Sequence, residues 1–184
     1  MTTDLGPADT GARVRIGAAD PRFDAVTDFY ATEAELLDDR LLARWLEECL
    51  ADDVVYQVPV RTTRGADAPV EFLGHMYHLD ENRASLGARV AREGTGLAWA
   101  EDPPSRARRH LSALRVYEGP EPGELLARMN VLLTRNRLDR PTYELLSYER
   151  RDRLVDPGDG LRLAERVALV DQSCLGMVNL AIFL

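Results

Sequence analysis

Four successive runs of β-compatible residues lie in the stretch LSALRVYEGPEPGELLARMNVLLTRNRLDRPTYELLSYERRDRLVDPGDGLRLAERVALV, which covers residues 111–170. The runs cover residues 111–118, 125–137, 143–155 and 161–170. Segments rich in Gly, Pro and Asp separate them, and DPGDG at residues 156–160 is a strong turn signal between two strands. This part of the chain therefore predicts a long antiparallel meander.

The N-terminal part of the chain has a different pattern. Residues 1–20 are rich in Gly, Thr, Ala and Asp and lack an apolar period, which predicts a mobile arm. From Phe23 the apolar residues recur at three- and four-residue steps, and Asp20-Pro21 supplies a helix cap and first-turn pair. A second helix is expected to begin at Asp38-Asp39. Helices followed by strands that twist predict a single α+β domain over residues 21–184, with N-terminal helices packed on a strongly curved, mainly antiparallel sheet.

The middle of the chain and its end carry weaker signals. Residues 54–58 alternate in polarity and predict a strand that ends near a proline. Asp80 is expected to cap the next helix. Pro103-Pro104 excludes regular helix or central strand around WAEDPPSR at residues 99–106. Residues 178–183 are expected to add a short final strand.

Charge and composition limit the classes of partner. The chain has 184 residues, of which 23 are basic, all of them Arg, and 31 are acidic, giving a net charge of −8. This balance disfavours nonspecific binding to nucleic acid or an anionic membrane, because neutralising phosphate requires surplus cation. The flat guanidinium fork of Arg suits bidentate, partly buried ion pairs, including those at subunit interfaces.

The cysteines and the hydropathy pattern indicate a cytoplasmic protein. Cys49 and Cys174 are far apart in the sequence and form no disulfide framework. The start of the chain shows no signal-peptide pattern, and no apolar run approaches the roughly 20 residues that span a bilayer.

Catalytic and metal-binding motifs are sparse. His75-x-x-His78 followed by Asp80 is weighed as a two-histidine, one-carboxylate iron site, but surface or interface histidines explain the pair better. Two separated cysteines exclude an iron–sulfur cluster or a zinc ribbon in this chain. Cys49 lies on an apolar stripe, where a buried, inert thiol is expected. His110 or Tyr56 with an Asp would be the acid–base pair of an enclosed pocket, although a core or interface role suits each better.

Arginine clusters occur at residues 135–140 and 150–153. Asp139, Glu149 and Asp152 lie among them, so solvated strand edges are one interpretation. An ion-pair surface between subunits is the other.

Several segments together resemble the small, or beta, subunits of aromatic-ring-hydroxylating dioxygenases. EAELLDDRLLARWLEECLADDVVYQVPVR at residues 33–61 is similar to the N-terminal signature of that family. WAEDPPSRARRHLSALRV at residues 99–116 resembles the biphenyl- and benzene-type members. LLSYERRDRLV, DPGDG, RLAERVALVDQS and NLAIFL follow in the expected order, so the resemblance covers residues 23–184. The family commonly has Ser-Asn where this chain has Ser112-Ala113, and Gly where it has Leu138.

The resemblance implies a nuclear-transport-factor-like cone and a structural role without catalytic, cofactor-binding or metal-binding residues. The Rieske [2Fe–2S] centre and the mononuclear iron would belong to a separate large, or alpha, subunit. Three chains of each kind would form a hexamer, with the small subunits associating as a trimer. The complex would hydroxylate an arene to a cis-dihydrodiol with dioxygen and electrons from a nicotinamide cofactor.

Two other functions remain open at this point. The chain could be a stand-alone enzyme, such as a dehydratase or isomerase, that uses the interior of the cone, or a small-molecule binding protein. For the small-subunit role, the expected interface residues lie in the irregular segment: Trp99, Asp102, Pro103 and Arg106. Specific contacts concentrate on such loops, and Trp and Arg are common interface anchors, although a core role suits Trp99 equally.

Overall fold

The strands form one curled sheet. The computed structural model describes residues 13–63, 72–93, 103–177 and 179–184. Within these ranges the strand order is β1-β4-β5-β6-β7-β2-β3. Only β2 and β7 run parallel, so the mainly antiparallel sheet is confirmed. The strands are β1 Arg15–Ile16, β2 Leu50–Arg61, β3 Phe72–Asn82, β4 Arg106–Glu118, β5 Leu125–Asn136, β6 Glu144–Val155 and β7 Arg162–Val170.

The predicted meander corresponds to strands β4 to β7. Side chains in β5 and β6 alternate between buried and more exposed positions, as expected for a sheet covered on one face. Leu133 pairs with Leu146 and Val131 with Tyr148, and all four side chains are buried. The β4–β5 turn needs Gly119, because a Cβ there would lie 2.4 Å from the Cβ of Glu124.

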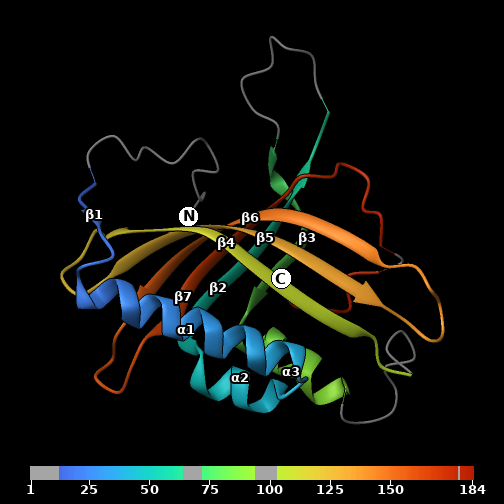
Figure 1. The fold of residues 1–184 in the computed structure, drawn as a ribbon, viewed down its shortest axis with the longest axis horizontal. Coiled ribbons are helices and arrows are strands. Elements are labelled where there is room, and N and C mark those ends of the chain that lie inside the picture. The colour runs from blue at the N-terminus through green and yellow to red at the C-terminus, as the bar shows by residue number, and fades with distance from the viewer. Residues whose placement is uncertain (1–12, 64–71, 94–102, 178) are drawn as a thin grey trace.

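Three helices cover the same face of the sheet (Figure 1). They are α1 Pro21–Asp38, α2 Leu42–Glu48 and α3 Arg83–Glu93. The predicted cap is confirmed, since the Asp20 side chain accepts a hydrogen bond from the backbone N–H of Arg22 at 2.9 Å. The buried residues of α1 are Val26, Tyr30, Glu33, Leu36 and Leu37. Glu33 is the only carboxylate among them.

Two predicted helix starts are wrong. Helix α1 continues through Asp38, and α2 begins only at Leu42. Asp80 lies within β3 and accepts a hydrogen bond from the side chain of Gln57. Asn82 takes the expected place of Asp80, because its side chain accepts from the backbone N–H at position 85, in the first turn of α3.

Both ends of the chain also differ from the prediction. Residues 1–12 of the expected arm lie outside the described residues, but Arg15–Ile16 pairs with β4 and Ile16 is buried. The arm prediction is therefore wrong for β1, which belongs to the sheet. Residues 179–184 form no strand and instead cross the interior beneath the sheet.

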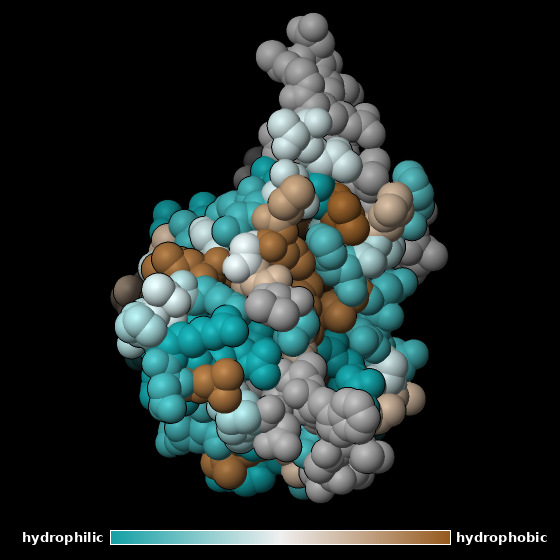
Figure 2. All heavy atoms as spheres, turned by 90° about the vertical axis from the view of Figure 1, so that its right-hand side faces the viewer, coloured by the Kyte–Doolittle hydropathy of each residue, from teal (hydrophilic) through white to brown (hydrophobic). Residues whose placement is uncertain are grey.

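The two departures from the family pattern fall on unusual backbone. Ala113 has φ +53° and Leu138 has φ +57°, in the left-handed region that favours Gly and Asn. Ala113 lies where the pairing of β4 with β5 shifts register, and Leu138 lies in the β5–β6 turn. Figure 2 views the molecule from the side of this turn, where apolar side chains lie among polar ones.

Candidate functional site

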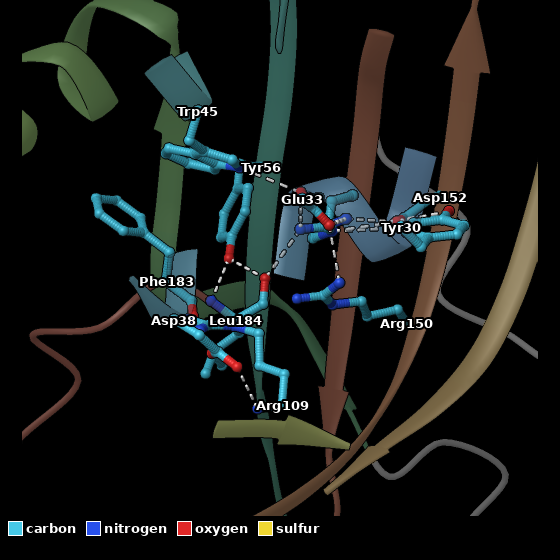
Figure 3. A network of polar contacts seen from close by, with 11 residues as sticks. Tyr30, Glu33, Asp38, Trp45, Tyr56, Arg109, Arg150, Asp152, Phe183 and Leu184 are labelled. Carbon is cyan, nitrogen blue, oxygen red and sulfur yellow. Dashed lines mark hydrogen bonds and ion pairs between the residues drawn. The ribbon is translucent and has the colours of Figure 1, made fainter. Parts of the chain in front are cut away.

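The interior of the cone holds a buried cluster of charges (Figure 3). Glu33 of α1 accepts hydrogen bonds from Arg166 of β7 at 2.8 Å to each carboxylate oxygen. Arg150 of β6 donates a further bond of 3.0 Å to Glu33. All three side chains are completely buried. Helix α1 is therefore fixed to the two strands through one carboxylate.

Aromatic residues and a second carboxylate complete this cluster. Arg166 also binds Asp152 of β6 through two nitrogens, at 3.0 and 2.7 Å. The Tyr30 hydroxyl donates to Asp152 at 2.9 Å, and the indole N–H of Trp45 donates to Glu33 at 3.2 Å. Two buried carboxylates thus balance two buried guanidinium groups.

The C-terminal residues fill the remaining space. The backbone oxygen of Leu184 accepts bonds from Arg166 and from the Tyr56 hydroxyl, which itself accepts from the Leu184 N–H. Arg109 bridges Asp38 and the Phe183 carbonyl at 2.5 Å each. The ring of Phe183 lies 4.6 Å from that of Trp45. The C-terminal residues therefore pack inside the cone against α2 and β2.

Burial and charged neighbours shift the pKa values of three groups in the cluster. Burial alone would raise the pKa of Glu33, but Arg166 and Arg150 outweigh it and lower the pKa to about 2. Burial raises the pKa of the Tyr56 hydroxyl, and burial together with Asp152 raises that of Tyr30. All three pKa values are therefore shifted away from neutral pH.

The predicted acid–base residues do not form a site. Tyr56 of β2 is buried against Leu184. His110 is exposed on the face of β4 that points away from the interior. The arginine cluster at residues 150–153 is also not a solvated edge throughout, because Arg150 is completely buried. The same correction applies to Arg135 in the other cluster.

The residues that the structure describes do not fit a Rieske centre or a mononuclear iron. Among the described residues, no three His, Cys, Asp or Glu side chains are grouped so that they could hold a metal. His75 and His78 lie in strand β3, and Cys49 and Cys174 are separate free thiols. Cys49 is buried, as predicted, and burial together with Glu33 raises its pKa to about 12. Within the same residues, no helix is both long and apolar enough to cross a membrane.

The four expected interface residues are only partly described. Trp99 and Asp102 lie outside the described residues. Pro103 is exposed, ahead of β4. Arg106 is exposed at the start of β4, and its guanidinium donates to the Asn136 side chain and, at 2.7 Å, to the Leu138 carbonyl. Arg106 therefore ties β4 to the β5–β6 turn.

A groove of about 980 Å³ lies at the other end of the sheet. Its walls are the N-terminal half of α1 and the β4–β5 and β6–β7 turns. Phe29, Leu125 and Leu161 contribute apolar surface, while seven carboxylates and one arginine lie around it. The carboxylates are those of Asp28, Glu48, Glu118, Glu121, Glu124, Asp156 and Asp159. Sequence reasoning missed this groove, because it joins segments far apart in the chain.

Comparison with known proteins identifies the family. A family model described as "Ring hydroxylating beta subunit" matches residues 32–177. This chain belongs to that family. The beta subunit of biphenyl 2,3-dioxygenase from Rhodococcus jostii is 33% identical over 186 residues, covering 98% of each chain. The family resemblance found in the sequence is thereby confirmed.

Solved structures agree with this assignment. A chain of naphthalene 1,2-dioxygenase superposes with a TM-score of 0.78 and 25% identity, covering 92% of this beta subunit and 95% of that chain. A Novosphingobium aromaticivorans structure assigned to a scytalone dehydratase has a TM-score of 0.58 at 11% identity, covering 83% and 85% of the two chains. The second similarity shows the fold alone. The beta subunit is a non-catalytic partner within an oxidoreductase complex.

Replacing Glu33 with Gln should destabilise the beta subunit by about 3–5 kcal/mol, because the buried Arg150 loses its carboxylate partner and Arg166 is left with Asp152 alone. Urea denaturation followed by circular dichroism measures this loss. Glu35→Gln, on the exposed face of the same helix, is the matched control and should change stability by at most about 0.5 kcal/mol. Equal effects of the two substitutions would contradict the role of Glu33.

Acid should weaken the fold through the same carboxylate. The folded pKa of Glu33 is about 2, against an ordinary value of 4.5, so its stabilising contribution is complete above about pH 4.5. The contribution is lost progressively as the pH falls towards about 2. The unfolding free energy of Glu33→Gln should therefore depend less on pH in this window than that of the parent chain. Parallel pH profiles would show that other groups cause the acid sensitivity.

The two thiols should differ sharply in reactivity. Cys174 is exposed, whereas Cys49 is buried with a pKa raised to about 12, and the thiolate is the reactive form. Ellman's reagent should therefore modify Cys174 rapidly in the folded isolated chain and both thiols after denaturation. Cys174→Ser serves as the control and should abolish the rapid phase. A rapid phase that persists in this variant would mean that Cys49 is accessible.

Proposed function

We propose that this chain is the structural small subunit of a multicomponent aromatic-ring-hydroxylating dioxygenase, in which it stabilises the assembly of the large subunits. Family membership over most of the chain carries this proposal. The described part of the interior supports it, because the cluster around Glu33 and the C-terminal residues occupy the space between the helices and the sheet.

The proposed complex contains three large and three small subunits. The large subunit holds the Rieske [2Fe–2S] cluster and the mononuclear iron, and the complex converts an arene to a cis-dihydrodiol. Curated relatives that are beta subunits of biphenyl and chlorobenzene dioxygenases support this reaction class.

Co-expression with a large subunit encoded beside it tests the proposal. Size-exclusion chromatography with light scattering should show a brown, iron-containing complex with the mass of three plus three chains. The small subunit expressed alone should be colourless. A chain that never co-purifies with a large subunit would overturn the proposal.

Arg106→Ala should weaken this assembly without unfolding the isolated chain. The arginine is exposed and holds the β5–β6 turn through two hydrogen bonds, so its loss releases an expected interface segment. Dilution of the complex, followed by light scattering, should show dissociation at higher protein concentration than in the parent. Arg92→Ala, which removes an exposed arginine from α3, is the control. Unchanged resistance to dilution in Arg106→Ala would contradict the prediction.

A further inference from the structure

The two ends of the sheet have opposite character. In an antiparallel meander the β4–β5 and β6–β7 turns lie at one end and the β5–β6 turn at the other. In Figure 1 the start of α1, the β4–β5 turn and the β6–β7 turn lie at the left, and the β5–β6 turn lies at the right. The left end holds the acidic groove, and the right end carries arginines and exposed apolar residues.

The groove contains negative charge that the chain itself does not neutralise. Glu118 pairs with Arg22, Glu124 with Arg153, and Asp159 with Arg162. Among the described residues, the side chains of Asp28 and Glu121 have no arginine partner, and Asp156 accepts only backbone N–H groups at positions 158 and 160. A cationic occupant with apolar side chains would match these carboxylates and the apolar walls between them.

The β5–β6 turn, whose residues 137–143 we call the tip, has that complementary chemistry. Arg137 and Arg140 form no ion pair with any described residue, and Arg106 binds the turn through neutral acceptors only. Leu138 is 47% exposed and Tyr143 is 66% exposed. With two arginines against the one carboxylate of Asp139, the tip presents a net positive charge as well as apolar surface.

Backbone strain at the tip points to a contact. Leu138 adopts φ +57°, which is unfavourable for a residue with a Cβ, and its apolar side chain is left facing solvent. Gly would relieve the strain at this position. A contact between the Leu138 side chain and another molecule would explain why a bulky apolar residue occupies this strained position.

We propose that the tip of one small subunit inserts into the acidic groove of a second copy, and that this contact builds the trimer. The inference rests on the proposed function of the chain as a small subunit. The contact joins two different surfaces, and such a contact closes into a ring of three when each copy is rotated by a third of a turn relative to the previous one. Arg137 and Arg140 would face Asp28 and Glu121, while Leu138 and Tyr143 would pack on the apolar walls beside Phe29.

Charge reversal at both surfaces tests the contact. R137E/R140E on the tip and D28R/E121R in the groove should each weaken self-association at least tenfold. Combining all four substitutions in one chain should restore it, because the complementarity returns with opposite sign. R92E, which reverses an exposed arginine of helix α3 that belongs to neither surface, is the control. Light scattering over a dilution series measures each variant, alone and within the co-expressed complex.

Leu138→Gly provides a second, independent measurement. It should raise the melting temperature of the isolated chain by relieving strain, and it should weaken self-association by removing the apolar anchor. A higher melting temperature with unchanged association would show that the strain serves no contact.

Several results would overturn the contact. One is that self-association is unchanged in both charge-reversed variants. A second is that the variant with all four substitutions does not recover self-association. A third is that particles of the parent protein never contain more than one small subunit. Failure of the proposed function is seen separately, as absence of binding between the parent chain and the large subunit. A normal three-plus-three complex that tolerates every reversal would refute the contact and leave the proposed function standing.

Discussion

The carboxylate of Glu33 is the contact on which the rest of the interior depends. A charge this deeply buried is costly unless partners surround it, and here two guanidinium groups and an indole N–H supply them. Because these partners come from β6, β7 and α2, the helix layer and the sheet have one favourable arrangement. The apolar core supplies most of the burial energy, whereas these directional bonds fix how the layers meet.

Arginine suits this arrangement better than lysine would. The guanidinium of Arg166 binds two carboxylates and the Leu184 backbone oxygen at once, which requires a planar fork of several donors. Arg89, Arg109 and Arg135 each donate to another backbone carbonyl between residues 179 and 183. Arginines from several elements therefore hold the C-terminal segment inside the cone.

The sequence was sufficient for the meander, the first helix cap and the family, but not for the charged interior. Alternation places Arg150 in phase with the buried Tyr148 and Leu146 of β6, and helical spacing places Glu33 in phase with Tyr30 and Leu37. The spacing of Arg150 and Glu33 therefore indicated buried positions, whereas their charge indicated exposed ones. Which strand faces which helix is set by the tertiary fold, so the pairing of Glu33 with Arg166 could not be read from either local pattern. The groove depends in the same way on turns that are distant in sequence.

Helix α1 connects the interior to the surface of the molecule. Asp28 and Phe29 line the groove, while Tyr30, the next residue, and Glu33, one turn further on, are bound inside the cone. The buried ion pairs that hold the helix therefore also fix one wall of the groove before any partner arrives. At the opposite end, Arg106 holds the Leu138 carbonyl and limits the freedom of the tip in the same way. Surfaces that are rigid beforehand lose little conformational entropy on binding, and this favours assembly as the role of a fold whose interior is packed with its own ion pairs.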